Sequence, residues 1–330
     1  RKTTNKNIPL ILGWNEFFNT GNVIHTIAPE DQISKCKHKC FYSENRNDLL
    51  NASAIIFHLN SPFNGFPSKR NFNQIYALFN LESPNYLNFN NLFNLNNYFN
   101  LTISYLAESK NNLYAPYGGL VKINKKLKTE DNIWTKKEIL NIINKKTKLA
   151  LVLISNCGAI SARDEYIEEL SKYINITKYG NCYQKLCNKN CYENELSSHF
   201  FYLAFENSVC NQYLTEKFWY PFRHLTVPVV LSRAALQGLE LPNDAFIGVD
   251  DFNNAKELAK YLIKISKNKI EYLRFFNWTK FYHRNNDIEP SNRAICKLCE
   301  LTYLNLPSNS LIIPNISNYL INEGKCIKQF

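Results

Sequence analysis

The second half of the chain alternates short apolar runs with segments of helical periodicity. The apolar runs predict buried strands at 149–155, 199–205, 227–231 and 245–249. Apolar residues on one face predict helices at 162–174, from about Thr215, and at about 254–265. Strands that alternate with helices in this way are typical of a parallel sheet with crossover connections. From residue 149 onward the sequence therefore predicts an α/β domain.

The first 120 residues or so are less regular. Apolar runs predict strands at 9–14, 52–59 and 75–81. An asparagine-rich stretch at 88–100 predicts a loop region, and the whole suggests a second, smaller α/β domain. A lysine-rich stretch at 122–148, with one helical segment at 135–144, is expected to connect the two domains. The predicted boundary is thus at residue 148.

Length and composition fit a folded protein of two domains. The chain has 330 residues, of which 45% are hydrophobic and only 20% charged. The formal charge is +11, and the stretch 122–148 supplies over half of that excess. Because arginine is absent there and only Trp134 is aromatic, we interpret it as a solvated linker and expect no nucleic-acid partner. No apolar run is long enough to span a membrane, so any membrane contact is expected through an N-terminal anchor absent from this chain.

Ten cysteines favour an oxidising compartment. The alternative is a zinc site of four thiolates, since the spacings of Cys36 with Cys40 and of Cys296 with Cys299 suit metal ligands. Glycosylation sequons do not decide between the two, because their number is about that expected by chance in so asparagine-rich a chain. The five sequons begin at Asn51, Asn100, Asn175, Asn277 and Asn315.

The stretch FENSVCNQYLTEKFW, residues 205–219, lies where a predicted strand ends and a helix begins. Ligands of parallel sheets bind at this edge, where helix N-termini favour anions. Lys217 in the first turn is unfavourable for the helix itself, which suggests an anionic ligand as its partner. The alternative is an ordinary amphipathic helix, with Phe218 and Trp219 in the core and Lys217 on a solvated face.

Motifs that would supply phosphate binding by other means are absent. The sequence has no glycine-rich phosphate loop and no Asp-x-Asp metal motif. The adjacent pair Asp250 and Asp251 is expected to point apart or to cap a helix rather than to chelate a metal ion together. Basic side chains would therefore have to carry the charge of a bound diphosphate. Glu82 follows the strand at 75–81 in a Ser-Pro turn, where an acid projects either into a cleft or onto an ordinary surface turn.

Several stretches spread over roughly residues 50–300 match one known pattern in order. They are FNLESP, FNLTISYLAES, LVLISNCGAISARDEYIEEL, FYLAFENSVCNQYLTEKFW, DAFIGVDDFNNAKELAKYL and CKLCEL. Together they resemble the α1,3-fucosyltransferases, glycosyltransferase family 10. The resemblance implies an α/β fold of GT-B type, with two Rossmann-like domains facing a cleft. Residues 1–148 would bind the acceptor and 149–290 the donor GDP-fucose, while a tail at 291–330 would return to the N-terminal domain.

The resemblance also implies an activity and a site. The enzyme would invert configuration, moving L-fucose from GDP-β-L-fucose to the 3-hydroxyl of GlcNAc in glycans of glycoproteins or glycolipids, in the Golgi lumen. Glu82 matches the family's proposed base, and Arg163 and Lys217 match its diphosphate contacts. The nucleotide and ribose contacts match Asn207, Tyr213 and Glu216. No cofactor would be required for the chemistry, a divalent metal ion being at most stimulatory.

By the same resemblance, Cys296 and Cys299 would pair with Cys36 and Cys40 and staple the tail to the N-terminal domain. Such bridges close very long loops, for which the chain-entropy model predicts the largest stabilisation. The other cysteines considered would form two more bridges with one thiol left over, in an open connectivity. These are Cys157, Cys182, Cys187, Cys191 and Cys210.

Some positions depart from the family pattern. Gln212 stands where an aspartate usually precedes the tyrosine of the site, and Leu106 and Ala107 stand where arginines are usual. Pro221 predicts an early end for the helix that begins near Thr215. A catalytically inactive relative that binds GDP or a glycan is therefore the alternative function. Core GlcNAc and outer-branch LacNAc both stay open as acceptors.

Overall fold

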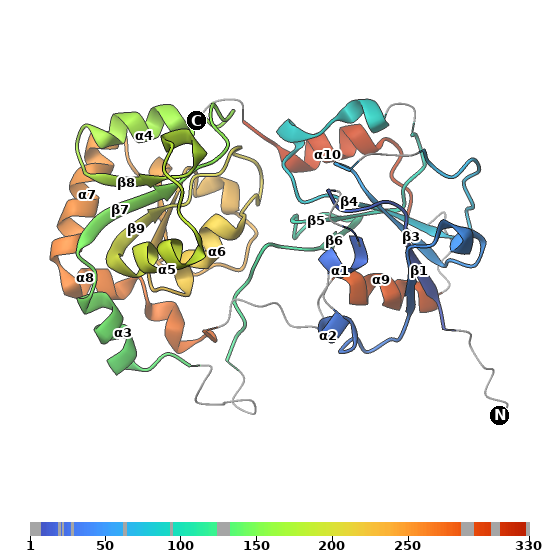
Figure 1. Cartoon of the computed structure of the whole chain (residues 1–330), viewed down its shortest axis with the longest axis horizontal. Coiled ribbons are helices and arrows are strands. Elements are labelled where there is room, and N and C mark those ends of the chain that lie inside the picture. The colour runs from blue at the N-terminus through green and yellow to red at the C-terminus, as the bar shows by residue number, and fades with distance from the viewer. Residues whose placement is uncertain are drawn as a thin grey trace. The chain divides into compact units, whose positions relative to one another are not determined.

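The chain forms two compact units in a computed structural model (Figure 1). Unit 1 comprises Arg1–Pro116 and Glu289–Lys325, and unit 2 comprises Tyr117–Ile288 and Cys326–Phe330. The polypeptide therefore passes from one unit to the other three times. The structure describes residues 8–18, 21, 23–27, 30–61, 65–92, 95–123, 133–284, 294–304 and 311–327.

Unit 1 is built on a sheet of six parallel strands in the order β2-β1-β3-β4-β5-β6. The three predicted strands are confirmed as β1, β3 and β4, which all have a neighbour on each side. Strands buried on both faces are apolar along their whole length, which is why these three were legible as continuous runs. The strands are β1 (Leu10–Gly13), β2 (Phe41–Ser43), β3 (Ala54–His58), β4 (Ile75–Phe79), β5 (Leu101–Ser104) and β6 (Asn112–Tyr114).

Two helices from the end of the chain cover the two faces of this sheet. Successive side chains of a strand point to opposite faces. Ile56 of β3 accordingly lies in one apolar cluster with Ile295 of α9 (Ala294–Tyr303), whereas its neighbour Ile55 lies in the other with Ile316 of α10 (Ile316–Gly324). The N-terminal sheet thus depends on the tail for both halves of its core. Among the described residues, the other helices of unit 1 are α1 (Val23–Ile27), α2 (Glu30–Ile33) and the 3₁₀ helices η1 (Arg46–Leu50), η2 (Pro84–Tyr86) and η3 (Phe89–Leu92).

Unit 2 contains a sheet of five parallel strands in the order β11-β10-β9-β7-β8. The strands predicted at 149–155, 199–205 and 227–231 are confirmed, and the one predicted at 245–249 is only two residues long. The strands are β7 (Lys148–Leu153), β8 (Ile176–Tyr179), β9 (His199–Leu203), β10 (Val227–Val230) and β11 (Ile247–Gly248).

Several helices of unit 2 begin at polar caps. Thr135, Thr215 and Asn254 each accept a hydrogen bond from a backbone N–H of the turn that they precede. Pro221 lies in the last turn of α6, which ends after seven residues, as the proline predicted. Within the described ranges, no helix is both long and apolar enough to cross a membrane. The helices are α3 (Lys136–Asn144), α4 (Arg163–Ser171), α5 (Lys189–Ser198), α6 (Glu216–Phe222), α7 (Ala255–Lys267) and α8 (Lys269–Arg274), with the 3₁₀ helices η6 (Asn181–Tyr183), η7 (Ala234–Leu236), η8 (Val249–Asp251) and η9 (Asn277–Lys280).

The lysine-rich segment differs from the expected solvated linker. Residues 124–132 lie outside the described residues, but 133–148 belong to unit 2. Ile143 of α3 is 4% exposed and packs in the main core. Lys146 is 5% exposed, and its Nζ donates to the carbonyl of His199 at 2.9 Å and to Thr226 Oγ1 at 2.8 Å. Burial lowers the pKa of Lys146 to about 7.

All ten cysteines form disulfides, so the expected leftover thiol is wrong. Cys326, which is outside the five cysteines considered, lies 116 residues from its partner Cys210. The predicted bridges of the tail are confirmed as Cys36–Cys296 and Cys40–Cys299, which removes the thiolate zinc site. Once one of these closes its long loop, the other closes only a short ring and therefore removes less entropy from the unfolded chain. The remaining bridges are Cys157–Cys182, Cys187–Cys191 and Cys210–Cys326.

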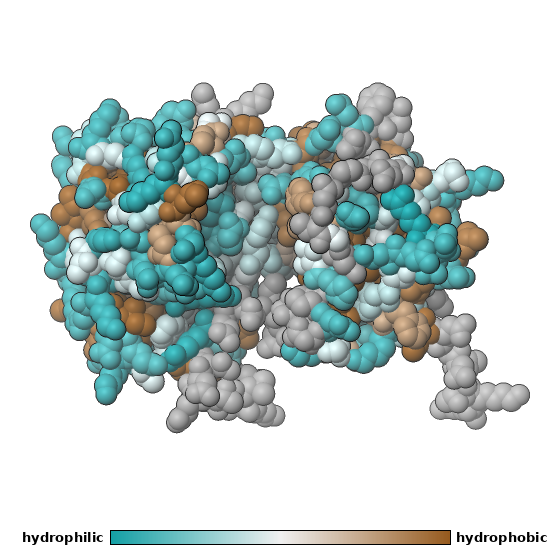
Figure 2. Space-filling view, viewed as in Figure 1, coloured by the Kyte–Doolittle hydropathy of each residue, from teal (hydrophilic) through white to brown (hydrophobic). Residues whose placement is uncertain are grey.

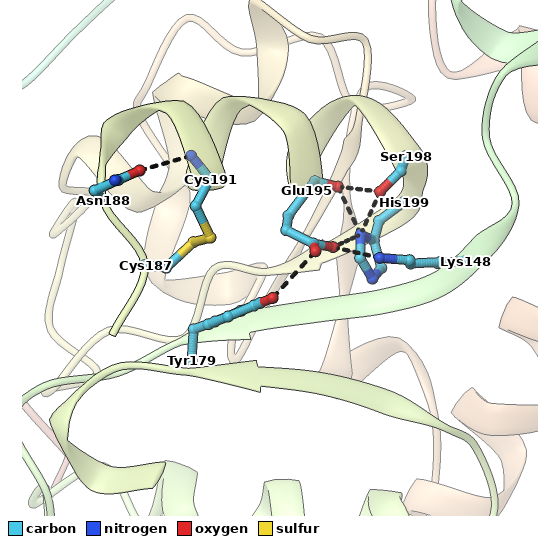
Figure 3. The surroundings of a disulfide bond; sticks show 8 residues. All are labelled: Lys148, Tyr179, Cys187, Asn188, Cys191, Glu195, Ser198 and His199. Carbon is cyan, nitrogen blue, oxygen red and sulfur yellow. Dashed lines mark hydrogen bonds and ion pairs between the residues drawn. A yellow bond between two sulfur atoms is a disulfide. The ribbon is translucent and has the colours of Figure 1, made fainter. Parts of the chain in front are cut away.

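A polar cluster joins α5 to the sheet of unit 2, beside the disulfide Cys187–Cys191 (Figure 3). The Glu195 carboxylate accepts hydrogen bonds from Lys148 Nζ at 2.8 Å and from the Tyr179 hydroxyl at 3.1 Å. His199 is fully buried, and its Nδ1 donates to the Glu195 carbonyl at 2.6 Å. Burial lowers the pKa of His199, so the ring is neutral and structural.

Candidate active site

Arg163 ties together the carboxyl ends of two neighbouring strands of unit 2. The residue begins α4 and is only 2% exposed. Its Nη1 donates to the Phe205 carbonyl just beyond β9 at 2.8 Å, and its Nη2 donates to the Asn156 carbonyl beyond β7 at 2.6 Å. Its buried Nε has no hydrogen-bond partner among the described residues. A buried donor left unpaired is costly unless something else satisfies it, so Arg163 is both an anchor and an open donor.

The turn before α4 is fixed by the same strand end. Ser161 Oγ donates to the Glu206 carbonyl at 2.7 Å, and the Ser161 N–H donates to the Asn207 carbonyl at 3.2 Å. Ala162 then adopts the left-handed conformation, with φ of 53°, which is unfavourable for any residue with a Cβ. The two hydrogen bonds hold this strained turn, which aims the start of α4 at the end of β9.

Glu206 is a buried carboxylate that the sequence analysis did not select. It is 6% exposed, and its Oε1 accepts from both the N–H and the hydroxyl of Thr215, each at 2.8 Å. Its Oε2 lies 3.5 Å from Lys217 Nζ. Thr215 in turn caps α6, so Glu206 fixes both the start of this helix and its first lysine. The available signal was an acid directly after a strand, eleven positions before an oddly placed lysine.

The interaction between Glu206 and Lys217 determines the charge that Lys217 carries at this edge of the sheet. Burial raises the pKa of Glu206, while Lys217 and Thr215 act to lower it. Burial acts to lower the pKa of Lys217, but Glu206 and Glu216 outweigh it, so that pKa is raised. Lys217 is therefore a cation at neutral pH. A quarter of its side chain stays exposed, which leaves this cation open to an anionic ligand.

The residues predicted to contact nucleotide and ribose lie around the same segment. Asn207 follows Glu206, and its buried Oδ1 accepts no hydrogen bond from the described residues. Tyr213 is 4% exposed and lines a small cavity with Glu206. Glu216 is largely exposed and accepts from Lys217 Nζ at 3.1 Å. The structure thus brings all five predicted donor-binding residues to the carboxyl edge of the unit 2 sheet.

Gln212, the departure from the family pattern in this loop, is buried and left-handed, with φ of 57°. Its N–H donates to the Ala235 carbonyl at 2.7 Å, and its side chain donates to the Gln237 carbonyl at 3.1 Å. Both contacts tie this loop to the segment after β10. The side-chain amide nitrogen of Gln212 therefore helps to fix the conformation of this loop.

The loop also receives the end of the chain. Cys326 is disulfide-bonded to Cys210, and the Ile327 N–H donates to the Val209 carbonyl at 2.9 Å. These residues stand between Asn207 and Tyr213 in the sequence. The tail therefore braces the segment that carries the predicted nucleotide contacts.

Glu82 lies in unit 1, at the carboxyl end of β4, and is half-buried. The side chain of Asn80 holds its backbone from both sides. Asn80 Nδ2 donates to the Glu82 carbonyl at 2.6 Å, and the Glu82 N–H donates to Asn80 Oδ1 at 3.2 Å. Burial raises the pKa of Tyr105, which lies just after β5, and the negative charge of Glu82 raises this pKa further. Glu82 therefore sits at the ligand edge of its own sheet in a fixed turn.

Metal ligation finds no support in the acidic pair Asp250 and Asp251. Asp250 accepts from Ser232 Oγ at 2.9 Å, and Asp251 pairs with Arg233 Nη2 at 2.8 Å. These acids cap local structure, as predicted. In the part of the chain that the structure describes, no group of three or more His, Cys, Asp or Glu could hold a metal ion.

Comparison with known proteins gives the chain its family. The family models "Fucosyltransferase, N-terminal" and "Glycosyltransferase family 10 (fucosyltransferase) C-term" match residues 6–118 and 143–318. The chain is 34% identical to the human 4-galactosyl-N-acetylglucosaminide 3-alpha-L-fucosyltransferase FUT6, over 88% of this chain and 78% of that one. It is 27% identical to the alpha-(1,3)-fucosyltransferase fut-1 of Caenorhabditis elegans, over 94% and 69%.

A solved structure agrees. The crystal structure of an α1,3-fucosyltransferase with GDP-fucose covers 92% of each chain with a TM-score of 0.59, at 18% identity. This likeness confirms the predicted α/β fold of GT-B type, and the relatives confirm the predicted class of enzyme, a fucosyl-transferring glycosyltransferase. The chain belongs to glycosyltransferase family 10, the fucosyltransferases.

Proposed function

We propose that the protein is an inverting α1,3-fucosyltransferase that moves L-fucose from GDP-β-L-fucose to the 3-hydroxyl of GlcNAc in glycans of glycoproteins or glycolipids. The observation that carries the proposal is the pair of cationic groups at the unit 2 edge. Lys217 is held by buried Glu206, and Arg163 Nε has no hydrogen-bond partner among the described residues. The human relative is named for a galactosyl-N-acetylglucosaminide acceptor, and the crystallised relative for GDP-fucose, which supports both substrates.

Donor binding rests on charge and on the strand-end loop. Lys217 and Arg163 offset the diphosphate charge and stabilise the additional charge that builds on it as the fucosyl bond breaks. Asn207, Tyr213 and Glu216 contact the nucleoside. No metal ion is required in this scheme, because the two cationic side chains do this work. A divalent ion is at most a stimulator.

Catalysis rests on Glu82 as the general base. The acceptor 3-hydroxyl attacks C1 of fucose, and the bond from C1 to the β-phosphate oxygen breaks with inversion. Glu82 takes the hydroxyl proton, and GDP leaves with the bonding electrons. Glu82 is suited to this role because Asn80 fixes its backbone while its side chain is only half-buried.

The Golgi lumen is the proposed location. Five disulfides with no free thiol suit an oxidising compartment. The alternative, an inactive relative that binds GDP or a glycan, is favoured by Gln212, Leu106 and Ala107 alone.

Incubation with GDP-fucose, LacNAc, chitobiose-core and N-glycan acceptors, in excess chelator, tests the proposal. Transfer should persist with chelator, and Glu82→Gln should abolish turnover while calorimetry shows unchanged GDP binding. Loss of transfer on chelation would reject the metal-free scheme, and normal turnover of Glu82→Gln would reject the base. Tight GDP binding without turnover on any acceptor would instead establish the inactive relative.

A further inference from the structure

We propose that Asn51 and Asn175 carry N-linked glycans, and that Asn100, which has the same sequence signal, stays unmodified in the folded protein. Five sequons occur, about the number that chance predicts, so the sequence cannot select among them. A folded protein can carry a glycan only on a side-chain amide that projects into solvent, because the glycan is bulky and hydrophilic. The environments of the five asparagines differ sharply in that respect.

Asn51 and Asn175 have exposed, unengaged amides. Asn51 directly follows η1 as its C-cap, and Asn175 lies between α4 and β8. Both side chains are exposed. Neither makes a hydrogen bond to another of the described residues. A glycan on either Nδ2 would therefore displace no contact of the fold.

Asn100 is the opposite case. It is 1% exposed, and its Oδ1 accepts from the Tyr76 N–H at 2.8 Å and from Arg70 Nη2 at 2.6 Å. These bonds fix the entry to β5 beside β4. A sugar at this amide would have to be buried in the core or would break both bonds, and either outcome is incompatible with the native packing.

The two accessible sites also lie away from the proposed substrate groups. Asn51 comes three residues before β3, and Asn175 comes directly before β8. Both are thus at the amino edge of an all-parallel sheet. Glu82 and the donor-binding residues are at the carboxyl edges of their own sheets, where ligands of such sheets bind. Bulky glycans at the amino edge of each sheet would therefore leave the carboxyl edge of the same sheet clear.

The remaining two sequons are not part of the proposal, because their amides are engaged. Asn277 Nδ2 donates to Asp244 at 3.3 Å. Asn315 Nδ2 donates to Asn96 at 3.1 Å, and its Oδ1 caps α10. The proposal therefore concerns the two exposed amides and the buried one.

The modification needs a co-reactant of the secretory pathway, a lipid-linked oligosaccharide diphosphate. A bond forms between the asparagine Nδ2 and C1 of the terminal GlcNAc, and the bond from C1 to the diphosphate oxygen breaks. The lipid diphosphate leaves with the electron pair, and one amide proton passes to the transferring enzyme. This inference rests on a secretory location, which the five disulfides support, and not on Glu82 or the donor site.

The test uses the full chain secreted from a glycosylating eukaryotic host, with the folded fraction isolated by gel filtration. Enzymatic removal of N-glycans in ¹⁸O-water converts each occupied asparagine to labelled aspartate, which peptide mass spectrometry locates. We expect label at Asn51 and Asn175 and none at Asn100. Asn51→Gln and Asn175→Gln should each remove one glycan, while Asn322→Gln, on exposed α10 surface outside any sequon, should remove none.

Label at Asn100 in the folded fraction, or an unlabelled Asn51 or Asn175, overturns the proposal. Fucosyl transfer is measured on the same preparations. The double variant Asn51→Gln, Asn175→Gln should keep the wild-type rate, and a large loss of rate would contradict the placement of the glycans away from the substrate groups. An enzyme without transferase activity leaves the label pattern decisive, so the two proposals fail separately.

Discussion

Gly324, at the end of α10, touches the turn that carries Glu82. A Cβ on Gly324 would lie 2.4 Å from Pro84 Cγ and 3.1 Å from Pro84 Cδ. Pro84 begins η2, two residues after Glu82, and Ser83 between them is fully buried. We predict that Gly324→Ala displaces the proposed base through this turn.

The size of the effect follows from the geometry. Carbon atoms in contact are separated by about 3.5–4.0 Å, so a new methyl group must move Pro84 or the helix by more than about 1 Å. The proline ring cannot rotate out of the way. Overpacking of this kind costs about 1–3 kcal/mol of stability. A misplacement of about 1 Å at a catalytic group costs roughly 100-fold in rate, so we expect kcat to fall between about 10-fold and 100-fold.

The assay is steady-state kinetics of fucosyl transfer with a parallel thermal melt. KM for GDP-fucose should stay unchanged, because the donor-binding residues belong to unit 2. Asn322→Ala, on the exposed side of the same helix, is the matched control and should match wild type in both measurements. A folded Gly324→Ala enzyme with wild-type kcat would refute the coupling of α10 to Glu82. A wild-type enzyme without turnover would refute the role of Glu82 itself.

Three further predictions concern buried ionisable groups. Lys217→Met should weaken GDP binding in calorimetry by about tenfold or more, because one charge-assisted contact of about 1.5 kcal/mol is lost. The variant should also have a lower Tm than wild type, and this difference should shrink on acidification because the unpaired Glu206 then takes up a proton. An equal difference in Tm at all pH values would contradict the pairing of Glu206 with Lys217. Burial lowers the pKa of Lys146 to about 7, so between about pH 7 and pH 10 the unfolded chain binds more protons and stability should rise with pH in wild type but not in Lys146→Met, as urea denaturation can check. Burial lowers the pKa of His58 to about 4, so this residue alone should lower stability by up to about 3 kcal/mol as the pH drops from about 6.5 to 4. His58→Gln should show a correspondingly smaller fall in the same assay, since burial also lowers the pKa values of His199 and His224.

Most of the fold could be predicted because its central strands are buried on both faces. Ala54–His58 is buried throughout, and such a strand is a plain apolar run in the sequence. Lys146 was misassigned to a linker because charge patterning treats a lysine as solvated. The oxygens that receive its ammonium group, such as the His199 carbonyl and Thr226 Oγ1, lie 53 and 80 residues away. No local pattern carries that information.

The candidate site was predicted in part for the same reason. Lys217 was identifiable because a lysine at a helix start contradicts a local rule. Glu206 explains how the lysine is tolerated, but it breaks no local rule and was therefore not identified from the sequence. The partner of Cys210 stayed open in the sequence because the cysteine that pairs with it is 116 residues distant. The placement of both depends on tertiary contacts.

The covering of the unit 1 sheet by α9 and α10 has a consequence for biosynthesis. The last strand of that sheet, β6, ends at Tyr114, whereas α9 begins only at Ala294. During translation the sheet segments therefore leave the ribosome long before the tail can complete the cover of either face. Unit 2 lies almost wholly between them and can fold first. The unit nearest the N-terminus is then the last to be completed, and its apolar strands must be shielded from aggregation until the tail arrives.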